Sequence, residues 1–542
     1  MPVVAARNWR RLSPSLRPRF PAVSISSSYA LICLTNSICV EAPGSSGGSS
    51  GGQVCAEHLT SKLRLFHRAW KKFRHDLLNF LPSEDKVPRK EVRRPGISGG
   101  KRGAEGVVDD LELTASSQVD ELCVASRKLL LVRGKRSHLV SECSGVILHT
   151  RVDGRVTVPI GVWLVGARGS VATTAVVGAA AVRAGAALPT GCVIEAAGFP
   201  GDFPPLADLV FGGHDVVGTP LRKRAELLAQ AGVLPPALTT LLSADIDAAE
   251  AEIRHGYVPG VETQAEAARR LAGDIADFRE RHGLSRVVVV DVSSTEPPAE
   301  VPYARLADLE EALASGADAL PPSSLYAYAA FLTGSGYVAF TPSAGPTPPA
   351  LDELARRNGA PYAGRDGKTG ETLIKSALAP MFAGRALRVR SWSGLNLLGG
   401  GDGATLADPA ARASKSASKA RAVPAIVGEE VEGLTHIDYV ADLGEWKTAW
   451  DHITFEGFLG VRMTMQFTWQ GCDSTLAAPL VLDLVRLVAR AQEAGHSGVL
   501  PELGYFFKDP LGGAGHDLPA QYARLVEFAR SLADEAPTGD RP

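Results

Sequence analysis

Lysine side chains recur in two short stretches of small and polar residues in the middle of the chain. Lys368 and Lys375 stand seven positions apart within residues 364–376, close to two turns if the segment is helical. Lys415 and Lys419 follow in a stretch rich in Ser and Ala. A desolvated lysine near other cations has a lowered pKa and can move protons near neutral pH, and a charged lysine can stabilise an oxyanion or hold a phosphate. Taken singly, each of these lysines is better explained as a surface residue beside a turn.

Residues 159–174 combine an apolar run, a glycine turn and a series of small residues, which predicts a strand, a phosphate loop and a helix. Gly166 permits the tight turn after the strand, and Gly169 lets the backbone approach a pyrophosphate. Ala172 lets the helix pack close to the strand while its N-terminal N–H groups face the anion. Arg168 occupies the usual second glycine position, so by spacing alone a glycine turn of any α/β protein explains the stretch about as well.

From Val156 onward, apolar strands alternate with Ala-rich helices, the pattern of a parallel sheet covered on both faces. Residues 208–216 predict a strand that ends in a glycine pair followed by His214 and Asp215. Residues 286–292 form a continuous β-branched run and predict a buried strand. The histidine, taken alone, is better explained as a hydrogen-bonded loop residue than as a catalyst.

Polar residues follow the predicted strands at their carboxyl ends. In an open parallel sheet, ligands bind at these ends. We therefore expect the Gly166 loop, the pair His214 and Asp215, and the run Ser294, Thr295 and Glu296 to converge on one cofactor. For either acid taken singly, a helix cap or a solvated loop is the better explanation.

The composition divides the chain into two unlike pieces. The 542 residues are 45% hydrophobic and carry a net charge of −2, which gives no indication of nucleic acid binding. Residues 1–155 carry 25 Lys+Arg and 14 Asp+Glu, against 32 and 45 in the remainder. Only Cys192 and Cys472 lie in the second piece, which indicates reduced thiols in a cytosolic protein and neither a disulfide framework nor a zinc site.

The first piece predicts a basic, low-complexity extension over residues 1–156, mostly disordered. Residues 1–40 are rich in Arg and Ser and resemble a transit segment, although an unstructured extension is the better explanation. Residues 44–52 are a Gly/Ser linker by composition. Residues 63–81 could form a basic amphipathic helix at a membrane surface, but a solvated helix explains them better, and we predict no membrane partner.

Seven motifs occur in an order that resembles the inositol-3-phosphate synthase family, in its shorter prokaryotic form, from about Val158 to the helix before Asp534. The motifs are 166–169 with Thr173 and Thr174, 211–215, 322–327, 364–376, 396–403, 414–419 and 472–480. The sequence departs from eukaryotic members at Gly400 and Gly401, which replace two asparagines, at Leu373, which replaces a further lysine, and at Glu445, near an expected aspartate.

The resemblance implies an α/β fold in which an NAD-binding Rossmann domain is interrupted by an α+β domain for catalysis and tetramerisation. The implied segments are 157–335 for the first part of the Rossmann domain, 336–436 for the inserted domain, 437–535 for the part that completes the Rossmann domain, and 536–542 for a tail.

The resemblance also implies a cytoplasmic, homotetrameric enzyme of inositol biosynthesis. It would cyclise glucose 6-phosphate to inositol 3-phosphate with no net redox change: oxidation at C5 by NAD, enolisation, closure onto the C1 aldehyde and reduction of the ring ketone. The implied catalytic residues are Lys368, Lys375, Lys419 and Lys508. The implied cofactor-binding residues are Gly166, Ala167, Arg168, Gly169, Ser170, Val171, Asp215, Ser294 and Thr295. The implied substrate-binding residues are Ser323, Asp402, Lys415 and Lys447, with no metal ligand predicted.

Two alternative functions stay open from the sequence. An NAD-dependent sugar-phosphate dehydrogenase would carry the same dinucleotide loop and would release NADH. A non-catalytic NAD-binding scaffold, tethered to an acidic partner by the basic extension, is the third interpretation, against which the four lysines argue.

Overall fold

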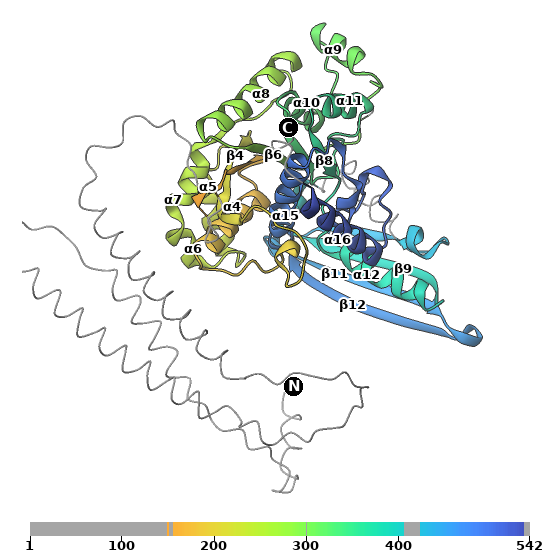
Figure 1. Ribbon diagram of the computed structural model, residues 1–542. Helices are drawn as coiled ribbons and strands as arrows, with labels where there is room; N and C mark the ends of the chain where they lie inside the picture. The colour runs from red at the N-terminus through yellow and green to blue at the C-terminus, as the bar shows by residue number, and fades with distance from the viewer. Residues whose placement is uncertain (1–148, 151–155, 300, 406–422, 536–542) are drawn as a thin grey trace, which may run out of the picture. The chain divides into compact units, whose positions relative to one another are not determined.

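A computed structural model describes residues 149–150, 156–299, 301–405 and 423–535 of the chain (Figure 1). These residues fall within one compact unit, Lys135–Pro542. The predicted extension over 1–156 lies almost entirely outside the described residues, but its last part contains β1 (His149–Thr150), which pairs antiparallel with β2 (Val156–Thr157). Lys415 and Lys419 also lie outside the described residues.

The larger sheet in the described part of the chain is parallel throughout, with the strand order β13-β8-β7-β6-β3-β4-β5. Its strands are β3 (Ile160–Val165), β4 (Leu209–Asp215), β5 (Ile253–His255), β6 (Arg286–Asp291), β7 (Gly336–Ala339), β8 (Pro361–Gly364) and β13 (Gly498–Val499). The predicted strands at 208–216 and 286–292 are confirmed as β4 and β6.

Both faces of this sheet are buried, as the uninterrupted apolar strands predict. Val162 and Leu164 of β3 belong to one hydrophobic core, and the alternating Trp163 and Val165 belong to another. Because successive side chains of a strand point to opposite faces, these two cores lie on opposite sides of the sheet.

Helices cover each face. The Val162 side holds α4 (Ser170–Arg183), α5 (Leu221–Gln230), α6 (Pro236–Leu241), α7 (Ser243–Ala251), α15 (Asp473–Glu493) and α16 (Leu518–Asp534). The Trp163 side holds α8 (Gln264–Arg281), α9 (Leu306–Ala314), α10 (Pro322–Leu332) and α11 (Pro349–Arg357).

A second sheet has the strand order β10-β9-β11-β12 and lies beside α12 (Glu371–Gly384) in Figure 1. Its strands are β9 (Arg388–Leu398), β10 (Thr435–Tyr439), β11 (Trp446–Glu456) and β12 (Arg462–Cys472). Phe382 of α12 packs with Trp392 and Ile453 of this sheet in a separate small core. The glycine-rich stretch after β9 forms the short helix α13 (Gly400–Thr405).

Sheet membership differs from the expected segment boundaries at 336 and 436. Strands β7 and β8, expected in the inserted domain, pair with β6 and extend the parallel sheet, because their short buried runs continue its backbone ladder. Strands β11 and β12, expected in the C-terminal part, pair with β9 in the second sheet. The division of the chain into domains stays a prediction.

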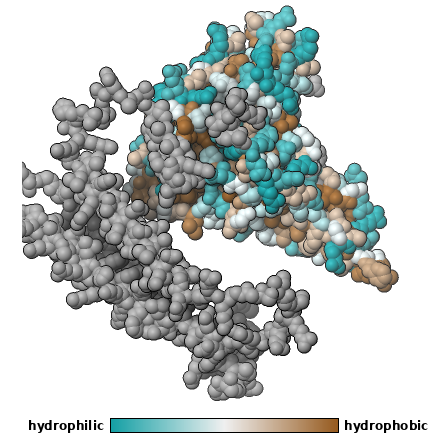
Figure 2. Space-filling view, in the orientation of Figure 1, coloured by the Kyte–Doolittle hydropathy of each residue, from teal (hydrophilic) through white to brown (hydrophobic). Residues whose placement is uncertain are grey.

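The β11–β12 hairpin extends away from the parallel sheet and reaches the lower right of Figures 1 and 2. Its turn is apolar, with Phe458 90% and Leu459 84% exposed. Separately, no helix among the described residues is long and apolar enough to cross a bilayer.

Helix α15 should carry much of the stability of the parallel sheet, because it contacts α4 and strands β6, β7 and β8. Leu484 in this helix is fully buried. We expect Leu484→Ala to lower the free energy of unfolding by about 2–5 kcal/mol through lost burial and a residual cavity. Chemical denaturation measures this change.

Leu188→Ala is the matched control, since Leu188 is 82% exposed and its truncation should change the free energy by less than about 0.5 kcal/mol. Equal effects of the two substitutions would contradict the packing of α15 on the sheet.

Candidate active site

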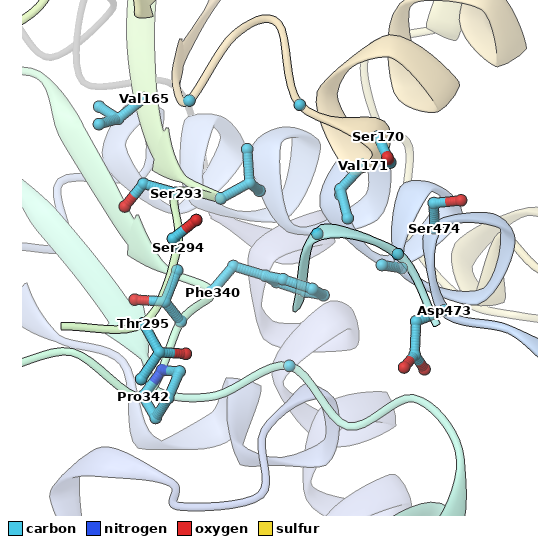
Figure 3. Close-up of a pocket in the computed structure, with 18 of the residues that line it drawn as sticks. Val165, Ser170, Val171, Ser293, Ser294, Thr295, Phe340, Pro342, Asp473 and Ser474 are labelled. Carbon is cyan, nitrogen blue, oxygen red and sulfur yellow. The ribbon is translucent and has the colours of Figure 1, made fainter. Parts of the chain in front are cut away.

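A cavity of about 540 Å³ opens at the carboxyl ends of the parallel strands and is closed on another side by the second sheet. Figure 3 shows Ser170 and Val171 from the start of α4, Ser293 to Thr295 after β6, and Asp473 and Ser474 at the start of α15 around it. The predicted residues that line the cavity are Gly166, Arg168, Gly169, Ser170, Val171, His214, Asp215, Ser294, Thr295, Glu296, Lys447 and Lys508. Ala167, Ser323, Lys368 and Lys375 do not line it.

The loop between β3 and α4 has the geometry that its glycines predict. Gly166 has a φ of +82°, and a Cβ there would lie 2.9 Å from the Cα of Ser293. Gly169 stands at the N-terminus of α4, which has no side-chain cap. The first-turn N–H groups of α4 are therefore open to an anionic ligand.

Arg168 replaces the usual second glycine without placing its charge freely in the cavity. Its guanidinium lies 2.6 Å from the carboxylate of Glu250 in α7 and donates to the carbonyl oxygen of Val217 at 3.0 Å. The long side chain of Arg168 is thus bound to neighbouring elements and does not disturb the backbone path of the loop.

Asp215 ends β4 at the cavity wall, where its carboxylate can accept hydrogen bonds from the hydroxyl groups of a ribose. Its two carboxylate oxygens accept the backbone N–H groups of Arg168 and Val217, each at 2.7 Å. These bonds fix the carboxylate and tie the end of β4 to the phosphate loop.

His214 is fully buried and has hydrogen-bond partners at both ring nitrogens. The indole Nε1 of Trp163 donates to Nδ1 at 2.8 Å, and Nε2 lies 3.1 Å from a carboxylate oxygen of Asp274. Burial lowers the pKa of the histidine below its usual value. The interpretation of His214 as a hydrogen-bonded residue is confirmed, although it lies in strand β4 and not in a loop.

Glu296 lines the cavity and caps α10 from the loop after β6. Its carboxylate accepts the backbone N–H of Ser323 at 2.7 Å and the hydroxyl of Ser323 at 2.5 Å. The helix-cap explanation of this acid is confirmed. Burial raises the pKa of Glu296 to about 7. The hydroxyl of Ser323 is engaged with Glu296, so its predicted contact with substrate stays a prediction.

Two segments far apart in the sequence pair at the end of β8 and bring Lys368 and Lys508 to the same place. Residues 365–368 bond to residues 506–509 through their backbones, with Lys508 N to Asp366 O at 2.7 Å and Lys368 N to Phe506 O at 2.8 Å. An ion pair between Arg365 and Asp509 at 2.7 Å adds to this pairing.

The two amines from this pairing have different partners. Lys508 Nζ lies 2.8 Å from a carboxylate oxygen of Asp366, which makes a charged pair at the cavity wall. Lys368, three residues before α12, donates to the amide oxygen of Gln521 at 2.5 Å and is 3% exposed. Burial lowers the pKa of Lys368 to about 7.

The second sheet contributes a third amine and reaches the phosphate loop. Lys447, at the start of β11, is ion-paired with Asp473, which also accepts the hydroxyl of Thr369 at 2.8 Å. Next to it, Glu445 accepts the hydroxyl of Ser170 at 2.9 Å, at the first residue of α4. The cavity is therefore built jointly by the two sheets.

Sequence reasoning missed Glu445 as a site residue, although its departure from the expected aspartate was a signal. It also missed Asp366 and Asp473, the carboxylate partners of two site lysines. Asp366 lies in the 364–376 motif, two residues before Lys368. Asp473 lies in the 472–480 motif, directly after Cys472. Their places in these motifs could have identified both acids as site residues. Nothing in the sequence pointed to Gln521.

A family model for myo-inositol-1-phosphate synthase matches residues 160–530. The chain belongs to this family. An inositol-3-phosphate synthase of Bacteroides thetaiotaomicron is 32% identical over 411 residues, which cover 69% of this chain and 96% of that protein. The enzyme of the same name from Rattus norvegicus is 32% identical over 339 residues, 56% of this chain and 60% of that protein.

Solved structures share the fold. The inositol-3-phosphate synthase of Caenorhabditis elegans superposes with a TM-score of 0.59 at 23% identity, covering 75% of this chain and 97% of that one. A myo-inositol-1-phosphate synthase-related protein of Thermotoga maritima gives 0.56 at 25% identity, with 70% and 100% covered. The predicted family and the α/β class with a parallel sheet are confirmed.

The site offers two kinds of amine for chemistry. Lys447 and Lys508 each face a carboxylate and can supply positive charge to a phosphate or an oxyanion. Lys368 faces a neutral amide and can exchange a proton near pH 7. Among the described residues, no group of three His, Cys, Asp or Glu side chains is placed to hold a metal ion.

The buried amine of Lys368 should make stability depend on pH. Its pKa is about 7 in the folded protein against 10.5 for an exposed lysine, so between these values the unfolded chain binds a proton that the folded chain does not. The free energy of unfolding should therefore rise with pH in this window, by up to about 1.4 kcal/mol per unit from this group. Below pH 7 the amine is protonated in both states, and the folded protein bears the full cost of burying its charge.

Lys368→Met lacks this group, so we expect the stability of the wild type relative to the variant to increase from pH 7 to pH 9. Urea denaturation at both values measures the difference, with Lys223→Met, an exposed surface lysine, as the control that should follow the wild type. Parallel pH curves for the wild type and Lys368→Met would contradict the assigned pKa.

Proposed function

We propose that this enzyme converts glucose 6-phosphate to inositol 3-phosphate in a redox-neutral cyclisation that uses NAD. The observation that supports it most is the single cavity in which the start of α4 meets the side chains of Lys447 and Lys508. A dinucleotide loop alone fits any dehydrogenase. The amines of Lys447 and Lys508 beside the loop can stabilise the negative charges of a sugar phosphate and of its enolate. The names of the relatives agree with this reaction.

The residues around β3 and α4 fit a dinucleotide. The uncapped first turn of α4 suits a pyrophosphate, Gly169 leaves room for close approach, and Asp215 suits a ribose diol. When bound, NAD supplies a hydride acceptor for C5 of the sugar and returns the hydride after ring closure. The residues that would hold it are Gly166, Ala167, Arg168, Gly169, Ser170, Val171, Asp215, Ser294 and Thr295.

The lysines would carry the proton and charge changes of the sugar. A ketone at C5 makes the C6 protons acidic, and we assign the removal of one to Lys368, whose pKa near 7 leaves much of the amine neutral. This role requires the amine, which is buried against Gln521 and does not line the cavity, to turn toward the substrate. Lys508 and Lys447 would hold the phosphate and the enolate oxygen. Carbon C6 then bonds to the C1 aldehyde carbon, whose oxygen takes a proton and becomes a hydroxyl.

The remaining site assignments stay predictions. Lys375 is buried beside Glu371 and is proposed as part of the lysine set. Lys419 and Lys415 lie outside the described residues, and Asp402 falls within α13. The homotetramer and the cytoplasmic location also stay predictions.

Turnover and cofactor binding should be lost together when the phosphate loop is filled. In Gly169→Val the added side chain occupies the approach to the α4 N-terminus, since even a Cβ would lie 3.1 Å from the carbonyl oxygen of Gly166. We expect NAD affinity, measured by calorimetry, to fall at least about tenfold, and inositol phosphate production from glucose 6-phosphate to fall with it.

Gly178→Val is the matched control in the same helix, because a Cβ at Gly178 meets no atom within 4 Å. The wild type should need added or retained NAD and should accumulate no free NADH. Stoichiometric NADH release would support the dehydrogenase instead, and unchanged NAD affinity in Gly169→Val would show that the loop is wrongly assigned.

A further inference from the structure

Three ionisable side chains are buried together at the cavity wall, between α12 and the second sheet. Glu371 and Lys375 come from α12, and Asp451 comes from β11. The amine of Lys375 lies 2.6 Å from Glu371 Oε1, and these side chains are 3% and 1% exposed. Asp451 is fully buried, and Glu371 lines the cavity. Lys375 and Asp451 are therefore shielded from solvent, while Glu371 borders the cavity.

The second sheet has room for two carboxylates at this point. Gly394 of β9 stands directly opposite Asp451 in the strand register. A Cβ at Gly394 would lie 2.9 Å from Glu371 Oε1 and 3.1 Å from Asp451 Oδ1. Trp392 Nε1 donates to Asp451 Oδ1 at 2.7 Å. A side chain larger than glycine at position 394 would push the two acids apart.

The charges in the cluster do not balance unless it also holds a proton. Two carboxyl groups face one amine, which also donates to the hydroxyl of Thr435 at 3.2 Å. Two buried carboxylates beside one ammonium leave one negative charge unbalanced, and a proton bound by either carboxyl group would remove it. Burial, and next the charge of Glu371, raise the pKa of Asp451 to about 6, although Lys375 opposes this shift.

Among the residues that the structure describes, few other charges face the cluster from the elements packed around it. On β11 the next charged inward position is Lys447, whose charge is paired with Asp473. Strand β9 presents Trp392, Gly394 and Asn396, and β10 presents Thr435, none of which ionises. The shared proton therefore decides the net charge of this part of the wall.

We propose that Asp451 is a positioning residue for the substrate: through the proton that it shares with Glu371, it sets the charge of the cavity wall beside Lys375 and so the strength with which the cavity holds an anionic sugar. This inference rests on the proposed function, because it takes a sugar phosphate as the ligand. With the proton in place, one carboxylate balances one ammonium and the cluster is neutral. When the proton leaves, the cluster carries one negative charge and repels the anion.

The titration can be observed without substrate or activity. Trp392 donates its indole N–H to Asp451, so fluorine NMR of the full chain labelled with 5-fluorotryptophan reports the ionisation, with the signal assigned by Trp392→Phe. We expect the Trp392 signal to shift with a midpoint near pH 6 in the wild type and to stay constant in Asp451→Asn. Glu371→Gln, which removes the second acid, should also abolish that midpoint. A wild-type signal that does not titrate between pH 5 and 8 would overturn the proposal.

Binding supplies the second test. Glucose 6-sulfate keeps a constant charge across this range, unlike a phosphate ester, whose second pKa is about 6. Its affinity for the wild type should fall about fivefold or more from pH 5 to pH 8, and should fall less steeply in Asp451→Asn, where Glu296 and Lys368 still titrate. Asp438→Asn, an exposed acid on β10, should behave as the wild type.

The outcomes separate the inference from the proposed function. The same pH dependence in the wild type and Asp451→Asn, or no binding of glucose 6-sulfate by the wild type at either pH, would overturn the inference. Failure of the wild type to turn over glucose 6-phosphate would count against the proposed function, while the Trp392 titration would still decide whether the proton is shared.

Discussion

The site depends on one backbone pairing, between residues 365–368 at the end of β8 and residues 506–509 near the C-terminus. Gly367 lies in an antiparallel bridge with Phe507, and a Cβ at Gly367 would lie 2.2 Å from the ring of Phe340. Only glycine at position 367 allows the ring of Phe340 to lie so close to the backbone. Without this pairing, Lys368 and Lys508 would have no fixed relation to each other or to the parallel sheet.

The pairing places amines where water is scarce, and each amine is then defined by its partner. Asp366 forms an ion pair with Lys508, whereas the amide of Gln521 can accept a hydrogen bond from Lys368 but cannot balance its charge. One backbone pairing thus positions both an ion-paired amine and an amine that exchanges protons near neutral pH. An enolate reaction on a phosphorylated sugar needs both a positive charge and a proton acceptor.

Local sequence patterns predicted those elements that are determined by residues close together in the sequence. The β-branched run of β6 and the glycine turn after β3 are explained by burial and backbone freedom within a few residues, and parallel-sheet geometry then brings the loops after β3, β4 and β6 to one edge. Contacts between distant segments leave no such periodicity. For this reason the sequence did not indicate that Gln521 meets Lys368, that Glu445 reaches Ser170, or that β7 and β8 extend the parallel sheet.

We propose that oxidation and reduction occur on the same sugar within one cavity, and the fate of the hydrogen at C5 tests this most directly. Glucose 6-phosphate deuterated at C5 is incubated with the enzyme and a catalytic amount of NAD, and the product and the cofactor are analysed by NMR. We expect the deuterium to stay on a single ring carbon of inositol phosphate, because the hydrogen that leaves C5 returns to that carbon. Deuterium that accumulates in free NADH, or that is lost to water, would contradict it.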